Sequence, residues 1–416
     1  MKFGLQGIRA LLNSTGNPHT SFSSIHIAGT NGKGSTASMI AAMLTAAGYK
    51  TGLYTSPHVV DFTERIRING KPIPQRDVVE ILRKLKPLVR RNKATFFETV
   101  TAIAFHFFAQ RKVDIAVIET GLGGRLDATN VIEPLISVIT TIGLDHTEIL
   151  GKTISKIASE KAGIIKPGIP CVVGVLEPVA RQVIKKIARQ RSSALIRTSA
   201  KIKIISSGIN GTQFDVKTGR TQFKKLTLSL AGIHQVANAI LALKTVQQLD
   251  KIKTIHVPES AIRKGLARVQ LYSGLQSRLS LVHRNPLIIA DVAHNPDAVS
   301  ALVRSLQDLS INSVILVFGV SADKDFLRMA QLLKPIVDRA IVVSAKTERA
   351  RRTRDIVQAL TEQHIPAEVE IGVQEGLQRA MRLTTAKQPI LVTGSHFVVG
   401  EALAFLQKKK YLTINQ

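Results

Sequence analysis

Apolar and polar residues follow each other along the chain in a pattern that predicts strands and helices in alternation. Short apolar runs, typical of buried strands, begin at residues 25, 51, 114, 135 and 170. Helical periodicity lies between them, over residues 35–48, 77–91, 99–110 and 178–191. This alternation predicts a mostly parallel sheet covered by helices.

The pattern changes twice further along the chain. Residues 201–230 form short alternating segments separated by Gly and Asn, which predict a small antiparallel sheet. Helices are expected over 234–249 and 258–269, and a second series of strands begins at residues 287, 313, 339 and 389. We therefore predict an α/β protein with a catalytic domain at residues 1–271, a linker at 272–285 and a smaller Rossmann-like domain at 286–416.

Length and composition narrow the class of protein. A chain of 416 residues is too long for one hydrophobic core, which agrees with more than one domain. No apolar run is long enough to span a bilayer, and no continuous apolar signal segment stands near the start. Cys171 is the only cysteine, so an internal disulfide is excluded. These features predict a cytoplasmic protein without membrane contacts.

The charge is strongly positive, with 57 Lys and Arg against 29 Asp and Glu and a formal net charge of +28. Such a balance is typical of proteins that bind nucleic acid or another polyanion. Here the basic residues are scattered in small clusters, aromatic residues make up 4% of the chain, and Trp is absent. Because few aromatic side chains are present to stack on bases, an ordinary basic surface is favoured over a nucleic-acid site. The positive field of such a surface would also attract ATP.

The segment IHIAGTNGKGST, at residues 25–36, joins a short strand to a helix through a glycine-rich turn. Glycines let backbone N–H groups converge on phosphate oxygens, and the helix N-terminus adds partial positive charge. Lys33 can reach the terminal phosphates, and Ser35 or Thr36 can reach a phosphate or its magnesium ion. Gly34 separates Lys33 from Ser35, so the loop is a variant of the usual Walker pattern; the alternative is a glycine-rich turn that only begins a helix. The predicted loop consists of Gly29, Thr30, Asn31, Gly32, Lys33, Gly34, Ser35 and Thr36.

Three further polar residues stand where predicted strands end: Ser56, Glu119 and His146. Each has a simpler interpretation, as a turn residue, a helix cap or ion pair, and a structural histidine. In open α/β sheets, however, ligands bind at the carboxyl ends of strands. Oxygen ligands and an imidazole together would suit a magnesium ion near ATP phosphates.

Two other segments carry polar residues that could be either structural or in contact with a ligand. Lys161 falls late on a predicted helix, where by its chemistry alone it would face the helix dipole. Asp291 and His294 follow a strand of the second series, and Asn295 with Pro296 can begin the next helix. Their place at a strand end suits ligand contact as well as a structural role.

Taken in order, these motifs resemble the Mur ligase superfamily and, within it, the dihydrofolate synthase/folylpolyglutamate synthase family. The resemblance runs along nearly the whole chain. It is carried by AGTNGKGS, TSPH, FTERIRING, FFETVTAIAF, ETGLGGRLDATN, LDHTEILG, SEKAGIIK, HQVANA, DVAHNP and DKD. Each motif is weak alone, but their order is specific.

The resemblance implies roles for individual residues. Lys33 and Ser35 would bind ATP phosphates, and Lys33, Lys161 and His146 would be the catalytic side chains. The implied ligands of two magnesium ions are Ser35, Ser56, Glu119, His146 and a carbamylated Lys161. The implied nucleotide contacts beyond the loop are Asn238, Arg278, Asp291 and His294. The implied neighbours of the pterin substrate are Phe62 and Arg65 of FTERIR and Asp127, Ala128 and Thr129 of LDATN.

The implied reaction is ATP-dependent amide bond formation through an acyl phosphate, with ADP and phosphate released. The substrates would be ATP, L-glutamate and either dihydropteroate or a reduced folate, and the enzyme would be a monomer that does not bind nucleic acid. Two alternatives remain open, another Mur-type amino-acid ligase and a basic P-loop NTPase that acts on nucleic acid. The GLGGRLDATN and TSPH motifs favour the folate enzymes over another Mur-type ligase. A P-loop NTPase that acts on nucleic acid would not explain the DVAHNP motif.

Two departures from the family pattern accompany the resemblance. The GLQGIRALL element begins at Gly4, without the helical segment that usually precedes it. The junction between the domains reads YSGLQSR instead of containing Pro-Gly-Arg, and Arg278 is aligned with that arginine.

Overall fold

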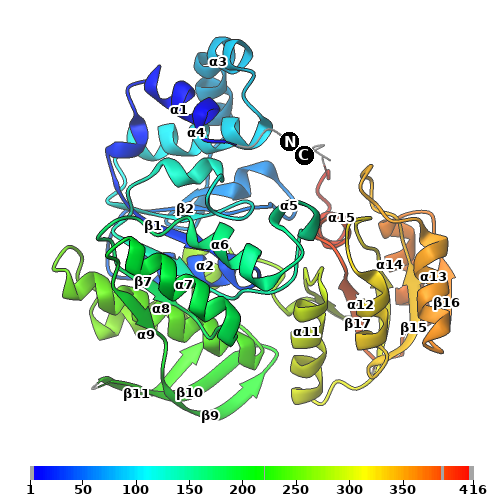
Figure 1. The fold of residues 1–416 in the computed structure, drawn as a ribbon. Coiled ribbons are helices and arrows are strands. Elements are labelled where there is room, and N and C mark those ends of the chain that lie inside the picture. The colour runs from blue at the N-terminus through cyan, green and yellow to red at the C-terminus, as the bar shows by residue number, and fades with distance from the viewer. Residues whose placement is uncertain (1–3, 220, 386–387, 412–416) are drawn as a thin grey trace.

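The computed structural model describes residues 4–219, 221–385 and 388–411, and it folds into two α/β bodies that lie side by side (Figure 1). The main body holds a mostly parallel sheet and a small antiparallel sheet, and the second body holds another mostly parallel sheet. The predicted fold class is confirmed, including the smaller Rossmann-like C-terminal part.

The large sheet of the main body is parallel except for a hairpin at one edge. Its strand order is β4-β3-β2-β5-β1-β6-β7-β8, and β3 and β4 form the antiparallel hairpin. The strands are β1 (Ser23–Ala28), β2 (Thr51–Tyr54), β3 (Ile66–Ile68), β4 (Lys71–Pro72), β5 (Ile115–Glu119), β6 (Ile136–Ile139), β7 (Cys171–Val173) and β8 (Leu195–Arg197).

Helices cover both faces of this sheet, because successive side chains of a strand point to opposite sides. Ile115 and Val117 of β5 join the core that contains α2, whereas Ala116 and Ile118 join the core on the side of α1, α3 and α4. The helices are α1 (Gln6–Asn13), α2 (Lys33–Ala46), α3 (Gln75–Asn92), α4 (Phe96–Gln110), α5 (Thr147–Leu150), α6 (Ile154–Ala162) and α7 (Pro178–Gln190). Short 3-10 turns are η1 (Pro18–Thr20), η2 (Phe62–Arg65) and η3 (Ala128–Val131).

Helix α2 is buried on nearly every side, since a second layer covers the face that the sheet does not. The layer contains α8 (Ile233–Lys251), α9 (Glu259–Ala267), α10 (Val269–Ser273) and the antiparallel strands β9 (Lys201–Gly208), β10 (Gly211–Thr218) and β11 (Thr221–Leu228). Phe214 and Leu226 of this small sheet share one core with Ile40 of α2. The loop that leads into α2 is therefore anchored by a helix with little freedom to move.

The second body has the strand order β12-β13-β17-β14-β15-β16, parallel except for β12 at one edge. Leu316 of β14 packs toward α11–α13, and Val317 packs toward α14 and α15. The elements are β12 (Ser280–Arg284), β13 (Leu287–Ala290), α11 (Pro296–Asp308), β14 (Val314–Phe318), α12 (Phe326–Leu333), β15 (Val337–Val342), α13 (Thr353–Glu362), β16 (Ala367–Val369), α14 (Val373–Leu383), β17 (Ile390–Thr393) and α15 (His396–Leu406).

Some boundaries differ from those predicted. Helix α4 begins at Phe96, because Thr95 and Glu98 exchange side-chain and backbone hydrogen bonds in a capping box. The helix expected over 258–269 is divided at Arg268, whose φ of −139° interrupts it. The hydrophobic pattern also does not predict β3, β4, β8, β12 and β16, which are short and lie at or near sheet edges.

The segment 272–285, predicted as a linker, contains the end of α10 and all of β12. Strand β12 pairs with β13 and so belongs to the second sheet. By membership of the sheets, the chain passes from one body to the other between Ser273 and Ser280. The domain limits at 271 and 286 stay a prediction.

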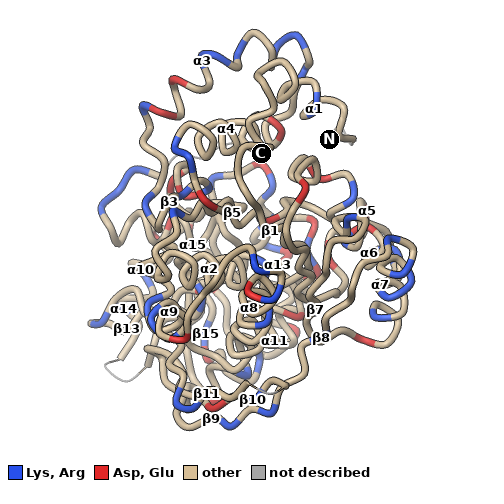
Figure 2. The backbone as a smooth tube through the Cα atoms, turned by 90° about the vertical axis from the view of Figure 1, so that its left-hand side faces the viewer, with Lys and Arg blue, Asp and Glu red and all other residues tan. Residues whose placement is uncertain are grey.

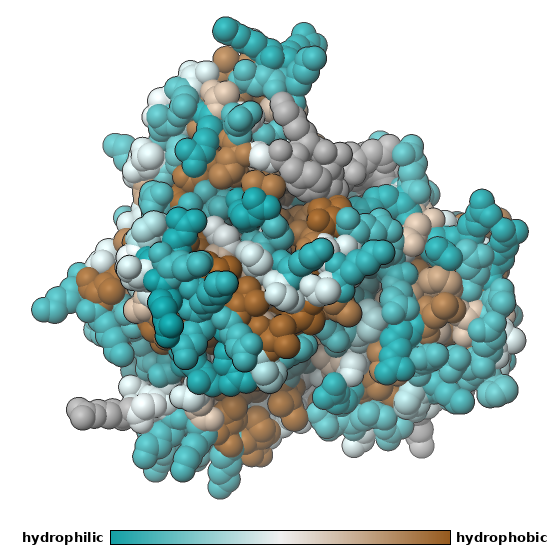
Figure 3. Space-filling model, viewed as in Figure 1, coloured by the Kyte–Doolittle hydropathy of each residue, from teal (hydrophilic) through white to brown (hydrophobic). Residues whose placement is uncertain are grey.

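The surface carries its positive charge in a dispersed way. On the face shown in Figure 2, Lys and Arg lie on many elements, among them α3, α7 and β9. The face in Figure 3 is mostly hydrophilic, and hydrophobic residues show in separate areas, including the region where the two bodies meet. None of the described helices is both long and apolar enough to cross a membrane.

Candidate active site

A cavity of about 1380 Å³ lies between the two bodies. Its walls are the segments that follow β1, β2, β5 and β6 in the main body and β13, β14 and β17 in the second. The carboxyl ends of both parallel sheets therefore open on one space, where open α/β folds bind ligands. The predicted site residues that line it are Gly29, Thr30, Asn31, Gly32, Lys33, Gly34, Ser35, Ser56, Arg65, Glu119, Asp127, Ala128, His146, Lys161, Asn238, Arg278, Asp291 and His294, whereas Thr36, Phe62 and Thr129 stand outside the lining.

The loop between β1 and α2 has a conformation suited to phosphate. Gly32 has a φ of +82°, and a Cβ there would lie 2.5 Å from Asn238 Oδ1. The Asn31 carbonyl accepts hydrogen bonds from Thr140 Oγ1 (2.6 Å) and Thr141 Oγ1 (3.1 Å), beyond the end of β6. Since α8 and β6 hold the loop on two sides, its N–H groups are fixed before any phosphate arrives.

Lys33 folds over its own loop. Its Nζ donates hydrogen bonds to the carbonyls of Gly29 (3.0 Å) and Thr30 (3.2 Å). The ammonium group is thus held at the mouth of the loop, where it can exchange these carbonyls for phosphate oxygens.

The structure explains why the loop departs from the usual Walker spacing. A Cβ at Gly34 would lie 3.4 Å from an Arg278 guanidinium nitrogen and 3.5 Å from Glu119 Oε2. A Ser or Thr at this position would push its side chain between these opposite charges. Glycine keeps that space open and leaves the hydroxyl to the next position, Ser35.

Glu119 ends β5 as a carboxylate that is only 3% exposed. Burial raises its pKa, whereas the nearby charge of Lys33 lowers it. Ser56 N donates a hydrogen bond to Glu119 Oε2 at 3.2 Å. A buried carboxylate beside a phosphate loop is a fitting ligand for a divalent cation.

The predicted metal ligands Ser35, Ser56, Glu119 and His146 all line the cavity. Within the part of the chain that the structure describes, no three His, Cys, Asp or Glu side chains come together as a metal-binding group. The donor set that is present, the Ser35 and Ser56 hydroxyls, the Glu119 carboxylate and the His146 imidazole, is incomplete by itself. This fits magnesium, which commonly takes one or two protein carboxylates and completes its shell with phosphate oxygens and water.

Lys161 is buried at the inner end of α6, with 4% of its surface exposed. Its Nζ donates a hydrogen bond to the Gly29 carbonyl at 2.8 Å. Burial, followed by the charge of Lys33, lowers the pKa of Lys161 to about 7. The side chain points into the site, so the dipole-facing surface interpretation is wrong, and a large neutral fraction makes the amine nucleophilic.

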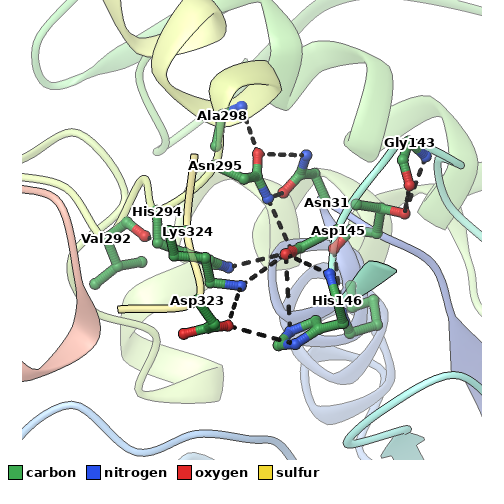
Figure 4. Close-up of polar contacts among 12 residues, drawn as sticks. Asn31, Gly143, Asp145, His146, Val292, His294, Asn295, Ala298, Asp323 and Lys324 are labelled. Atoms are coloured by element: carbon green, nitrogen blue, oxygen red, sulfur yellow. Dashed lines mark hydrogen bonds and ion pairs between the residues drawn. The ribbon is translucent and has the colours of Figure 1, made fainter. Parts of the chain in front are cut away.

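Asp145 joins the two bodies and was not among the predicted site residues. Figure 4 shows it at the centre of polar contacts from both sides. Lys324 Nζ lies 2.6 Å from Asp145 Oδ1, and Asn295 Nδ2 donates to Asp145 Oδ2 at 3.1 Å. Asn295 also exchanges side-chain hydrogen bonds of 3.1 and 3.2 Å with Asn31 of the phosphate loop. The signal in the sequence is positional: Asp145 and Lys324 each follow a strand end.

The charges around Asp145 set its ionisation. Burial would raise its pKa, but the contacts with His294 and Lys324 outweigh burial and hold the pKa far below its usual range. His146 lies 3.9 Å from both Asp145 and Asp323, yet burial lowers its pKa to about 4. A neutral His146 keeps a lone pair free for a metal ion.

The second body contributes Asp291 and His294 from the turn after β13. Asp291 accepts hydrogen bonds from Leu279 N (2.7 Å) and Ala293 N (2.8 Å), and so fixes the chain beside Arg278. The rings of His294 and His396 lie 5.2 Å apart. These residues place polar groups and aromatic surface opposite the phosphate loop.

Another part of the cavity wall, called here its aromatic end, contains Arg65, Phe96 and Asp127. Arg65 is 1% exposed, its Nε donates to His58 Nδ1 at 2.8 Å, and its guanidinium lies 5.6 Å from the centre of the Phe96 ring. The second terminal nitrogen of Arg65 has no hydrogen-bond partner. Asp127 faces the same end and accepts a hydrogen bond from Leu122 N at 2.8 Å. Flat aromatic walls with a carboxylate and a guanidinium suit a planar, polar ring.

Family comparisons cover most of the chain. Residues 27–246 match the Mur ligase middle domain, and residues 277–396 match the Mur ligase glutamate ligase domain. The chain is 38% identical over 369 residues to a dihydrofolate synthase/folylpolyglutamate synthase of Bacillus subtilis, covering 86% of this chain and 85% of that relative.

Solved structures agree with these matches. Folylpolyglutamate synthase of Mycobacterium tuberculosis complexed with ADP superposes with a TM-score of 0.90 at 32% identity, over 98% of this chain and 95% of the other. A bifunctional folylpolyglutamate synthase/dihydrofolate synthase with Mn, AMPPNP and L-glutamate bound superposes with a TM-score of 0.86 at 30% identity, over 98% and 95% of the two chains.

Proposed function

This chain belongs to the dihydrofolate synthase/folylpolyglutamate synthase family of Mur ligases, and we propose that it joins L-glutamate to dihydropteroate, to tetrahydrofolate, or to both. The family's enzymes are ATP-dependent ligases that use a divalent metal ion, and ADP, a nucleotide analogue and Mn are bound in the structures similar to this one. The observation that carries the proposal is a single cavity whose lining includes both the phosphate loop and aromatic side chains such as Phe96 and Phe97.

The chemistry requires the substrate carboxylate to be activated. The carboxylate attacks the γ-phosphorus of ATP, which gives an acyl phosphate and ADP, and the glutamate amine then displaces phosphate to form the amide. Backbone N–H groups of residues 29–36 and the Lys33 ammonium would hold the phosphates in line. The two bodies would exclude water, which otherwise hydrolyses the acyl phosphate.

We assign the metal-binding role to Ser35, Ser56, Glu119, His146 and Lys161. A bound magnesium ion would neutralise charge on the transferring phosphoryl group. The pKa of Lys161, lowered to about 7, supports carbamylation, because the neutral amine adds to carbon dioxide and gives an anion in place of a cation. Asn238, Arg278, Asp291 and His294 would complete the nucleotide site from the other walls of the cavity.

The pterin ring would occupy the aromatic end of the cavity. There Asp127 would accept hydrogen bonds from ring N–H groups, the buried Arg65 guanidinium would add positive charge, and the small Ala128 side chain would leave room for the ring. Phe62 would support this wall indirectly, because its ring packs edge-to-face on Phe96 with centroids 6.3 Å apart.

We further propose a monomeric cytoplasmic enzyme that does not bind nucleic acid. Both bodies that wall the cavity come from one chain, and the Lys and Arg residues are spread over many elements in Figure 2. Light scattering would measure the mass, and a gel shift at about 0.15 M salt would test nucleic-acid binding under physiological screening.

The test of the proposal is ADP release with ATP, magnesium and glutamate, together with either dihydropteroate or tetrahydrofolate. Dependence on dihydropteroate alone identifies a dihydrofolate synthase, dependence on tetrahydrofolate alone identifies tail extension, and dependence on both identifies a bifunctional enzyme. ADP release that neither pterin stimulates would overturn the proposal.

A further inference from the structure

His26 lies in the centre of the main sheet, on β1 between β5 and β6, and is fully buried. Its Nε2 is 2.8 Å from Thr129 Oγ1, and Thr129 Oγ1 donates to Asp127 Oδ1 at 2.5 Å. A continuous line of polar contacts thus runs from the middle of the sheet to the carboxylate at the aromatic end of the cavity. Neither His26 nor Thr129 lines that cavity.

The hydrogens in this line can be assigned by counting donors. A threonine hydroxyl has one hydrogen, and in this line that hydrogen goes to the Asp127 carboxylate. His26 must then be the donor to Thr129, with its proton on Nε2. Its Nδ1, which has no hydrogen-bond partner, carries the lone pair. The opposite tautomer would leave a buried N–H without a partner, which costs free energy.

Backbone groups complete the fixation of Asp127. Thr129 N donates to Oδ1 at 3.0 Å, and Leu122 N donates to Oδ2 at 2.8 Å. The three contacts to Oδ1 and Oδ2 from Thr129 and Leu122 set the plane of the carboxylate. Asp127 itself lines the cavity and is 6% exposed, so these contacts orient a carboxylate that belongs to the cavity wall.

We propose that His26 and Thr129 are positioning residues for the pterin-binding carboxylate, with neutral His26 donating through Nε2 to Thr129 and Thr129 donating to Asp127. The inference rests on the proposed function, in which Asp127 accepts hydrogen bonds from the pterin ring. The Thr129 hydroxyl orients Asp127, and His26 fixes the direction of that hydroxyl. Because this line contains no residue of the phosphate loop, binding of ATP is expected not to depend on it.

Kinetics of two Thr129 variants test the proposal. Thr129→Val, which keeps the shape but removes the hydroxyl, is expected to raise the KM for the pterin substrate about tenfold, equivalent to about 1.4 kcal/mol. Its KM for ATP should stay within about twofold, since the loss is confined to one hydrogen-bonded group. Thr129→Ser, which keeps the hydroxyl, should restore the pterin KM. Thr245→Val is the matched control, because Thr245 is also buried but bonds only to Leu241 O inside α8.

Nitrogen-15 NMR of histidine-labelled wild-type protein reads the tautomer directly, and the His26 signal is assigned by its shift in Thr129→Val. We expect a protonated Nε2 and an unprotonated Nδ1 that do not change between pH 5.5 and 8. A protonated Nδ1, an unchanged pterin KM in Thr129→Val, or equal losses in the Val and Ser variants would each overturn the proposal. The NMR result does not need ligase activity, so its failure is distinguishable from failure of the proposed function.

Discussion

At the scale of single residues, the cavity holds side chains whose ionisation is set by burial. Glu119 and Lys161 are both nearly inaccessible, yet each faces the phosphate loop. Burial raises the pKa of Glu119 and lowers that of Lys161. Such groups are costly to a fold unless a ligand or partner compensates them. Glu119 was predicted from its place at a strand end, whereas the role of Lys161 was implied only by the family resemblance.

The first prediction concerns the phosphate and metal ligands. Lys33→Ala, Glu119→Ala and His146→Ala should each reduce kcat for ligation by about a hundredfold or more, because each removes charge stabilisation at the transferring phosphoryl group. ADP release and urea unfolding would be measured side by side. Glu133→Ala, a change at an exposed glutamate, is the control. Near wild-type turnover of the Glu119 variant would contradict the assignment of Glu119 as a metal ligand.

The second prediction concerns the buried imidazole of His26. Burial lowers its pKa from 6.5 to about 3. Below pH 6.5, therefore, His26 is protonated in the unfolded chain but stays neutral in the folded protein. Stability therefore falls as the pH falls, and His26 alone should account for about 2 kcal/mol between pH 6.5 and pH 5.

Urea unfolding of wild type and His26→Leu at pH 7 and pH 5 measures this difference, since other histidines contribute equally to both proteins. The variant should lose less stability on acidification. If it does not fold, NMR titration of wild type gives the pKa of His26 directly, and a value near 6.5 contradicts the argument.

At the scale of elements, the boundaries follow capping chemistry more closely than hydrophobic pattern. Thr95 and Glu98 extend α4 beyond its apolar stripe, and Thr153 caps α6 by accepting from Lys156 N at 3.3 Å. Edge strands such as β12 and β16 carry no long apolar run, because only one of their sides is paired. The buried central strands β1, β5, β6 and β14 were all predicted from their apolar runs.

The third prediction concerns the cap of α6, the helix that carries Lys161. Thr153→Ala should destabilise the protein by about 1 kcal/mol, because the N–H of Lys156 loses its acceptor. Thr153→Ser keeps the acceptor and should be close to wild type. Denaturant unfolding distinguishes the two, and equal stability of Ala and Ser variants would argue that the cap contributes nothing.

At the scale of the whole molecule, the contacts that hold the bodies together include a polar one and an apolar one. The polar one is the set of contacts to Asp145 from Lys324 and Asn295. The apolar one consists of Val59 and Val60, which follow β2 but pack in the core of the second body with β13 and α15. Together with the contact between His234 of α8 and Ser305 of α11, they hold the two sheets so that both face the cavity.

The fourth prediction removes the polar contact. Lys324→Met leaves Asp145 without its closest cation in a site where the lysine side chain is only 7% exposed. Breaking a buried pair costs about 3–5 kcal/mol, which should open the bodies and reduce kcat at least tenfold. Small-angle scattering should show a larger radius of gyration than for Lys334→Met, a change at an exposed lysine of the same body. A compact, fully active Lys324 variant would show that the ion pair is dispensable.

Local sequence alone determined the alternation of strands and helices, the phosphate loop and the order of motifs, because periodicity, glycine placement and strand ends are local properties. Most of the site residues predicted from the sequence, from Gly29 to His294, line the cavity. Tertiary structure decided what depends on packing between distant segments. It brought Asp145 to Lys324, turned Lys161 inward, and aligned His26 with Asp127 through Thr129. These contacts join residues far apart in the chain, so no local pattern contains them.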